Sequence, residues 1–163
     1  PFPVGFKNTQ DGSPTTAIDG LHYARHPQKH ISTDLHGQLS VLDSPGNPYT
    51  HLVLRGGSTA PNFDTTSVEK AFQAQVELGI DTPILIDCSH DNVKGHKDQI
   101  EVFKAFLAQA CASKPKVFGA MIESHLEEGN AVSLTDPCLG LADTFKLLEH
   151  ADKQLSHAAL ALS

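Results

Sequence analysis

The stretch PILIDCSH, Pro83 to His90, is an apolar run that ends abruptly in reactive side chains. Its apolar part does not alternate with polar residues, which is typical of a strand buried on both faces of a parallel sheet. Three further runs have the same form, at residues 3–7, 51–55 and 117–123. The sequence therefore predicts four buried strands, each followed by its own loop and helix.

Helical patterns follow these strands. One helix is predicted between Thr66 and Gly79, because apolar residues recur there every four positions, at Val68, Phe72 and Val76. Thr66 and Glu69 have the spacing of a capping box at its start, and Gly79 can adopt the left-handed conformation that ends a helix. A weaker helix is expected over residues 15–25, because Gly20 costs about 1 kcal/mol relative to Ala inside a helix. Two further apolar stripes are expected on helices, one with Ile100, Phe103, Leu107 and Cys111, the other with Leu141, Phe145, Leu148, Leu155, Ala159 and Leu162.

Residues 30–51 break this alternation. Two strand-like segments, His30–Thr33 and Gln38–Val41, flank His36-Gly37, which predicts an inserted β-hairpin. The remaining strand–helix repetition predicts a parallel α/β fold. No linker or low-complexity tract interrupts it, so we expect a single domain over residues 1–163.

Composition narrows the class of protein. The chain has 163 residues, 39% hydrophobic and 19% charged, which suits a globular domain with a core. Its net charge of −7 argues against a nucleic-acid partner or an anionic membrane surface, and no apolar run reaches the ~18 residues of a membrane helix. Three cysteines without CxxC spacing indicate neither a disulfide framework nor a zinc ribbon, so we expect a reducing, cytoplasmic setting.

The first residues shape a further expectation. The chain opens at Pro1 without a methionine and enters an apolar run directly. It shows neither the basic segment nor the cleavage site of a signal peptide. We therefore expect no leader in this stretch and further residues upstream of it.

Each predicted strand ends in a polar side chain: Lys7, Arg55, Asp87 with His90, and Glu123. The carboxyl ends of parallel strands share one edge, where α/β proteins bind ligands. Lys7 and Arg55 would form an anion site there, and Gly56-Gly57 would let backbone N–H groups approach a phosphate or carboxylate. Any one of these cations alone is more simply explained as a solvated strand cap.

His90, Glu123 and Asp136 form a second group. An imidazole with two carboxylates suits a divalent Mn, Fe, Co or Zn ion. None of the three is spaced as a helical ligand pair, so the set would be assembled from neighbouring strand ends. Because the chain has ten histidines, a purely structural role for His90 stays open at this stage.

Several short motifs occur in one order along the chain: GFKN (5–8) with DG (11–12), LRGG (54–57), IDCSH (86–90), IESHLEEGN (122–130) and TDPCLG (135–140). From Pro1 to about Leu155 this order resembles the C-terminal half of the class I 3-deoxy-D-arabino-heptulosonate-7-phosphate (DAHP) synthases. The resemblance implies a (β/α)8 TIM-barrel type of fold, of which this chain would hold about four βα units, similar to strands five to eight, with the hairpin as the usual insertion.

The resemblance also implies an activity, the aldol-type condensation of phosphoenolpyruvate with erythrose 4-phosphate in the shikimate pathway. Lys7 and Arg55 would hold phosphoenolpyruvate, with Asp136 also at the substrate. His90, Glu123 and Asp136 would bind the divalent metal, and Lys7 and His90 would be catalytic. Asp87 and Ser89 are expected to support the strand end and orient His90. A homo-oligomer, or a separate N-terminal half-barrel chain, is the implied partner.

The sequence departs from the family pattern in ways that keep other readings open. A full barrel takes ~250 residues, the family's cysteine metal ligand has no counterpart, and the stretch from Glu123 to Asp136 is short. The alternatives are a non-catalytic or repurposed half-barrel binding module and a different metal-dependent lyase.

Overall fold

A computed structural model describes residues 2–112, 115–127 and 138–161. Asp136, a predicted metal ligand and substrate contact, lies outside these residues. The elements are β1 (Val4–Lys7), α1 (Thr15–Arg25), β2 (Gln28–Thr33), β3 (Leu39–Ser44), β4 (Thr50–Gly56), α2 (Thr65–Glu77), β5 (Ile84–Asp91), a 3₁₀ turn (His96–Asp98), α3 (Gln99–Ala110), β6 (Val117–Met121), β7 (Ser124–His125), β8 (Leu139–Gly140) and α4 (Leu141–Ala161).

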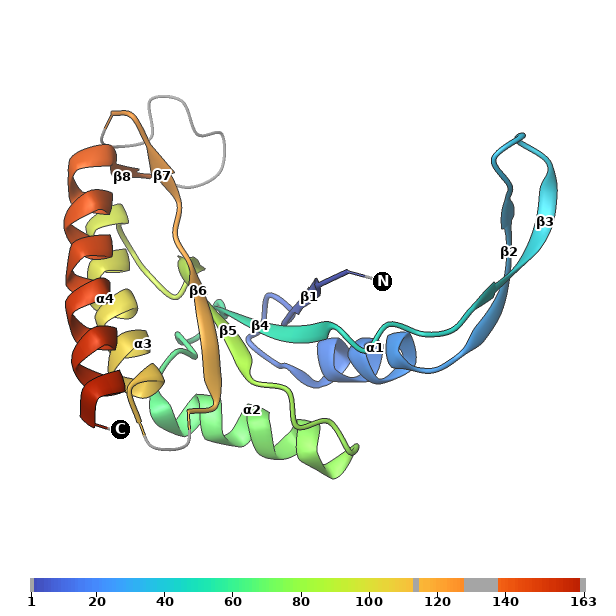
Figure 1. Cartoon of the computed structure of the whole chain (residues 1–163), viewed down its shortest axis with the longest axis horizontal. Helices are drawn as coiled ribbons and strands as arrows, with labels where there is room; N and C mark the ends of the chain where they lie inside the picture. Colours follow the sequence, from blue (N-terminus) through green and yellow to red (C-terminus); the bar gives the residue numbers. More distant parts are fainter. Residues whose placement is uncertain (1, 113–114, 128–137, 162–163) are drawn as a thin grey trace.

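The four predicted strands form one parallel sheet in the order β1-β4-β5-β6 (Figure 1). Apart from the separate β2–β3 pair, neighbours in this sheet follow one another along the chain, without the reversal of order that marks a doubly wound sheet. The predicted mixed α/β fold with a parallel sheet is therefore confirmed. None of the helices in the described part of the chain combines the length and apolarity needed to cross a bilayer.

The core lies on one face of this sheet. Alternate residues of β4 and β5 enter a single cluster with buried residues of all four helices: Leu52 and Leu54 from β4, and Ile84, Ile86 and Cys88 from β5. Because successive side chains of a strand point to opposite faces, Val53, Arg55, Leu85 and Asp87 point to the other face. The helices thus cover one face, and Arg55 and Asp87 project on the opposite one.

Helix α2 begins differently from the prediction. Asp64, not Thr66, is its N-cap, and the Asp64 carboxylate accepts hydrogen bonds from the N–H groups of Thr66 and Ser67. The predicted capping box of Thr66 and Glu69 is therefore wrong, since the N-cap is Asp64, two residues before Thr66. The predicted stop is confirmed, because Gly79 has a φ of +75°.

The weak helix prediction over residues 15–25 is also confirmed, and the structure explains its glycine. A Cβ atom on Gly20 would lie 3.2 Å from the ring of Phe6 on β1. Gly20 thus lets α1 approach the sheet closely, and this packing offsets its poor helix propensity.

Helix α4 buries a different face from the predicted one. Leu147 and Ala151 are its buried residues and pack in the core cluster. The predicted stripe instead remains 42–58% exposed at Leu141, Phe145, Leu148 and Leu155. Helical periodicity locates both apolar faces of α4 but does not tell which of them α3 covers.

The predicted hairpin is confirmed as β2 and β3, which pair antiparallel and extend away from the body of the molecule (Figure 1). Gly37 turns the chain with a φ of +78°, and the Asp34 carboxylate accepts the N–H groups of His36 and Gln38. One face of the hairpin carries Ile31 and Val41, which pair across the strands and are 73% and 66% exposed.

Candidate active site at the carboxyl edge of the sheet

The structure brings four of the five predicted site residues to one edge of the sheet. Lys7 ends β1, Arg55 lies near the end of β4, His90 lies near the end of β5, and Glu123 follows β6. These strands are parallel neighbours, so their carboxyl ends share this edge. The fifth residue, Asp136, lies outside the described residues.

Asp87 joins the predicted anion-binding and metal-binding groups. Its side chain is fully buried, and its Oδ2 atom lies 2.6 Å from Nζ of Lys7 and 2.9 Å from Nδ1 of His90. Its Oδ1 atom accepts the N–H of Ser89 at 2.9 Å. A buried carboxylate is costly unless it is paired and hydrogen-bonded, so these contacts fix both partners relative to each other.

His90 and Glu123 lie side by side, as expected of two ligands of one ion. Nδ1 of His90 is 3.7 Å from Oε1 of Glu123. Because Nδ1 faces the Asp87 carboxylate at 2.9 Å, the other ring nitrogen, Nε2, is the one that would bind an ion next to Glu123. His90 has a φ of +51°, a strained conformation for a residue with a Cβ, and such strain concentrates at functional sites.

The backbone of Glu123 is held on both sides. Its N–H donates to Oε1 of Gln99 at 3.0 Å, and its carbonyl accepts the N–H of Leu139 at 3.0 Å. Gln99 is itself fully buried at the start of α3. Within the described ranges, no three His, Cys, Asp or Glu side chains lie close enough together to hold a metal ion. The residues present therefore fit two positions of a ligand set.

Arg55 pairs with a carboxylate that the sequence analysis did not single out. Its Nη1 atom lies 2.8 Å from Oδ2 of Asp91, with the Arg55 side chain 16% exposed. The half-exposed carboxylate of Asp91 therefore competes with any incoming anion for the N–H donors of Arg55. Asp91 could have been suspected, because it directly follows His90 in the IDCSH motif.

Gly56 and Gly57 do not play the predicted role. The N–H of Gly56 donates to Oδ1 of Asn62, and the N–H of Gly57 donates to the carbonyl of Ala60, so both are used within the protein. The glycines instead permit close backbone approach. A Cβ on Gly57 would lie 2.4 Å from the Cα of Gly12, where the β1–α1 loop packs against the β4–α2 loop.

Cys88 lies between Asp87 and Ser89 but faces the core. Burial, and secondarily the charge of Asp87, raise the pKa of its thiol to about 12. A thiol in this state is a poor nucleophile and a poor metal ligand, because both roles need the thiolate. Cys88 therefore contributes packing.

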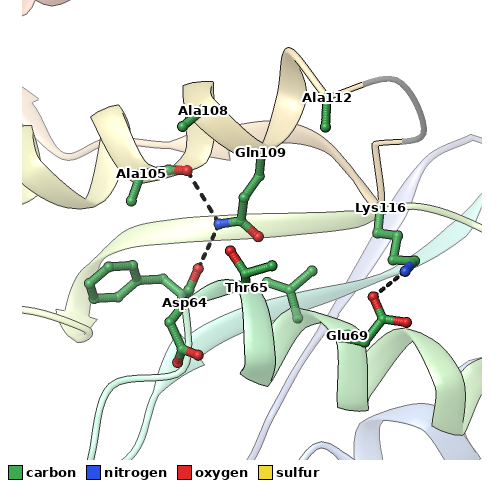
Figure 2. A pocket seen from close by; sticks show the side chains of 10 residues that line it. Asp64, Thr65, Glu69, Ala105, Ala108, Gln109, Ala112 and Lys116 are labelled. Atoms are coloured by element: carbon green, nitrogen blue, oxygen red, sulfur yellow. Dashed lines mark hydrogen bonds and ion pairs between the residues drawn. The ribbon is translucent and has the colours of Figure 1, made fainter.

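Two cavities flank the sheet. One, of about 490 Å³, lies at the carboxyl edge, lined by the β4–α2 loop, by Asp91 at the end of β5 and by residues that follow it. The other, of about 470 Å³, lies between the start of α2 and the end of α3 (Figure 2). There Lys116 pairs with Glu69, and Gln109 donates to the carbonyls of Phe63 and Ala105. This second cavity is on the helix-covered side, away from Lys7 and Arg55.

This arrangement defines an α/β protein with a parallel sheet whose carboxyl edge carries cations, a histidine and carboxylates. The sequence model of the DAHP synthetase I family matches residues 1–160. The chain belongs to the DAHP synthetase I family.

Known proteins agree with this assignment. The chain is 36% identical to the Trp-sensitive phospho-2-dehydro-3-deoxyheptonate aldolase of Enterobacter agglomerans, over 95% of this chain and 48% of that protein. It is 35% identical to the Tyr-sensitive enzyme of Salmonella typhimurium, over 95% of this chain and 47% of that protein. A solved phospho-2-dehydro-3-deoxyheptonate aldolase from Francisella tularensis aligns with a TM-score of 0.85 at 33% identity, covering 93% of this chain and 48% of that one.

The chain thus spans about half the length of the relatives it matches.

Proposed function

We propose that this chain supplies the phosphoenolpyruvate- and metal-binding edge of a DAHP synthase, which condenses phosphoenolpyruvate with erythrose 4-phosphate. The observation that carries the proposal is the buried Asp87 carboxylate, which lies against both Lys7 and His90. It ties the anion-binding group and the metal-binding group into one site. The family match supports this chemistry over a non-catalytic module or an unrelated lyase.

Lys7 and Arg55 bind the anionic substrate in this proposal. Arg55 offers a planar fork of donors suited to a phosphate or carboxylate, and Lys7 offers a point charge. Asp87 and Asp91 hold these cations in place and partly neutralise them before the substrate arrives. Phosphoenolpyruvate carries enough negative charge to take over donors of Arg55 from the half-exposed Asp91.

His90 and Glu123 would hold the divalent ion, with Asp136 as the third ligand expected from the sequence. When bound, such an ion polarises a carbonyl oxygen as a Lewis acid. Asp87 orients the ring of His90, and Gln99 fixes the backbone of Glu123. Partners of this kind set ligand orientation and affinity in metal sites.

The sheet needs further strands to complete the barrel that the family fold implies. Among the described strands, β1 pairs only with β4, and β6 only with β5, which leaves two open edges. Phe118 and Met121 on β6 are 52% and 38% exposed, and α4 presents its second apolar face, which includes Phe145. These surfaces fit a complementary half-barrel, from further residues of the same protein or from another chain.

A homo-oligomer is the second part of this proposal. Ile31 and Val41 form an exposed apolar face on a hairpin that extends from the body of the molecule. An isolated two-stranded hairpin is only marginally stable in water, so a covering surface would stabilise it. A cytoplasmic setting stays a prediction.

Binding of phosphoenolpyruvate tests the site directly. We expect calorimetry with Mn²⁺ present to show binding that weakens at least about tenfold in Arg55→Ala, the loss of roughly one charge-assisted contact. Lys29→Ala is the matched control, because Lys29 is also paired with an aspartate, Asp43, but lies on the hairpin. Equal affinity for phosphoenolpyruvate in the wild-type chain, Arg55→Ala and Lys29→Ala would refute the proposed site.

A further inference from the structure

Three asparagine side chains link the carboxyl ends of β1, β4 and β5. Asn8 directly follows β1, Asn92 directly follows β5, and Asn62 lies in the loop between β4 and α2. Asn8 and Asn92 are 3% and 5% exposed, and Asn62 is half-buried. We call these residues the asparagine rim.

Asn8 holds the backbone of Arg55 and Gly56 from the β1 side. Its Oδ1 atom accepts the N–H of Arg55 at 2.8 Å. Its Nδ2 group donates to the carbonyl of Gly56, also at 2.8 Å. One side chain therefore binds both residues that follow Leu54, with the two polar atoms of its amide.

Asn62 and Asn92 hold the same segment from the other side. Oδ1 of Asn62 accepts the N–H of Gly56 at 2.7 Å, and its Nδ2 group donates to Oδ1 of Asn8 at 3.3 Å. Asn92 donates to the carbonyls of Leu54 and Asp87, at 3.1 and 2.8 Å, and accepts the N–H of Asn62 at 2.8 Å.

The rim replaces sheet pairing where that pairing becomes irregular. The register between β4 and β5 shifts between Leu54 and Gly56, and Gly56 has a φ of +80°. Backbone polar groups that leave a ladder must find other partners when they are buried. The three amides supply these partners, and a fully bonded polar network selects one arrangement of the segment.

We propose that Asn8, Asn62 and Asn92 are positioning residues for Arg55, which fix its backbone so that the guanidinium meets an anion at the carboxyl edge. The inference rests on the proposed function for the identity of that anion, a phosphate ester that also carries a carboxylate. The positioning itself is a property of the chain alone, because every bond of the rim lies within the described residues.

Gln75 provides a matched control at the opposite edge of the sheet. It is a buried amide on α2 whose Nε2 group donates to the carbonyl of Thr82, just before β5. Gln75→Ala removes a buried amide as Asn8→Ala does, but far from Arg55 along the strands. A purely structural role of the rim would make the two variants behave alike.

The first readout is amide hydrogen exchange at Arg55 and Gly56 in the chain, measured by NMR. We expect Asn8→Ala to speed exchange at Arg55 at least about tenfold, beyond what its loss of global stability explains. Gln75→Ala should leave exchange at Arg55 no faster than its own global stability predicts. Asn62→Asp keeps an oxygen that accepts the Gly56 N–H but loses the donor to Asn8, so exchange at Gly56 should be slower than in Asn62→Ala and faster than in the wild-type chain. Exchange in Asn8→Ala that matches Gln75→Ala at equal stability would overturn the proposal.

The second readout is affinity for inorganic phosphate and for phosphoenolpyruvate. We expect Asn8→Ala to bind phosphoenolpyruvate at least about fivefold more weakly than Gln75→Ala. Equal affinities in the two variants, with the wild-type chain binding normally, would contradict the positioning role. If the wild-type chain binds neither ligand, the proposed function fails, and the exchange measurement alone then decides the role of the rim.

Discussion

The two edges of the parallel sheet use the same kinds of side chain in different ways. At the amino edge, Arg25 donates to Thr50 Oγ1, the Thr50 carbonyl and Thr82 Oγ1, all of them neutral oxygens. At the carboxyl edge, Lys7 and Arg55 pair with the carboxylates of Asp87 and Asp91. The first arrangement satisfies a cation permanently within the fold. The second keeps charge of both signs at a rim that a charged ligand can enter.

The comparison teaches that charge by itself does not mark the site. Arg25 and Arg55 would be equally good anion-binding candidates by residue type, and their partners distinguish them. The division agrees with the general rule for (β/α) barrels, in which the carboxyl edge carries function and the amino edge carries stability.

The largest expected effect is steric and belongs to the carboxyl edge. Gly57→Ala should cost about 3 kcal/mol of unfolding free energy, because its Cβ would meet the backbone of Gly12 at 2.4 Å. Gly79→Ala, just after α2 and before β5, should cost only about 1 kcal/mol, since its Cβ meets nothing within 4 Å and only its φ of +75° is strained. Urea denaturation measures both, and equal costs would remove this contrast between the edges.

The next effect is electrostatic. Asp87→Ala should lower the unfolding free energy by about 2 kcal/mol, less than for a fully buried pair because Lys7 is 36% exposed. It should also lower the affinity for Mn²⁺, measured by competition with a chelator, since His90 loses its orienting contact.

Arg25→Met is the control for Asp87→Ala at the amino edge. It should destabilise the fold through lost hydrogen bonds to Thr50 and Thr82, yet leave the affinity for Mn²⁺ unchanged. Loss of metal affinity in both variants would mean that destabilisation, and not the contact with His90, is responsible.

A smaller effect tests the helix cap that the sequence misplaced. Asp64→Ala should cost about 1 kcal/mol, and Thr66→Ala much less, because Asp64 accepts the N–H groups at the start of α2. The hydrogen bond from Ser67, above all, lowers the pKa of Asp64 below its ordinary value of 3.8. The stabilisation is therefore present above about pH 4 and is lost as the pH falls through the folded pKa. Thermal unfolding of both variants at neutral and acidic pH checks the sign.

The smallest effect concerns Cys88. Burial raises the pKa of this thiol from its ordinary value of 9.0 to about 12, so the unfolded thiol loses its proton first as the pH rises. Stability should therefore fall by about 0.8 kcal/mol from neutral pH to about pH 9.5 on account of this thiol. Cys88→Ala should show a correspondingly smaller loss over the same range. Identical pH dependence of both proteins would contradict the assignment.

The fold could be predicted from the sequence where one physical signal dominates. Uninterrupted apolar runs located all four strands of the sheet, but the predicted burial holds for β4 and β5 and is wrong for β1 and β6, which lie at its open edges. The hairpin was found through its turn residues, and Gly79 through its place after α2. The prediction of which face of α4 is buried was wrong. Leu147 and Leu148 are equally apolar, and only tertiary packing decides that Leu147 is buried and Leu148 is exposed.

The site could be predicted in part. Lys7, Arg55, His90 and Glu123 were proposed from their positions at strand ends, and the structure places them at one edge, while their roles stay predictions. Asn8, Asn62 and Asn92 were missed, because an amide near a strand end is also ordinary turn chemistry. Only the folded structure shows that the three amides bind the same backbone segment, from Leu54 to Gly56. The role given to Gly56 and Gly57 failed because Asn62 and Ala60 of the β4–α2 loop take up their N–H groups.

Formation of DAHP from phosphoenolpyruvate and erythrose 4-phosphate tests the central claim most directly. The chain would be assayed with Mn²⁺, alone and together with the N-terminal half of the Francisella tularensis relative, using wild-type protein and Lys7→Ala. The account predicts DAHP from the wild-type mixture, and none from the chain alone or from the Lys7→Ala mixture. DAHP formed at the same rate by the Lys7→Ala mixture, or by the chain alone, would contradict it.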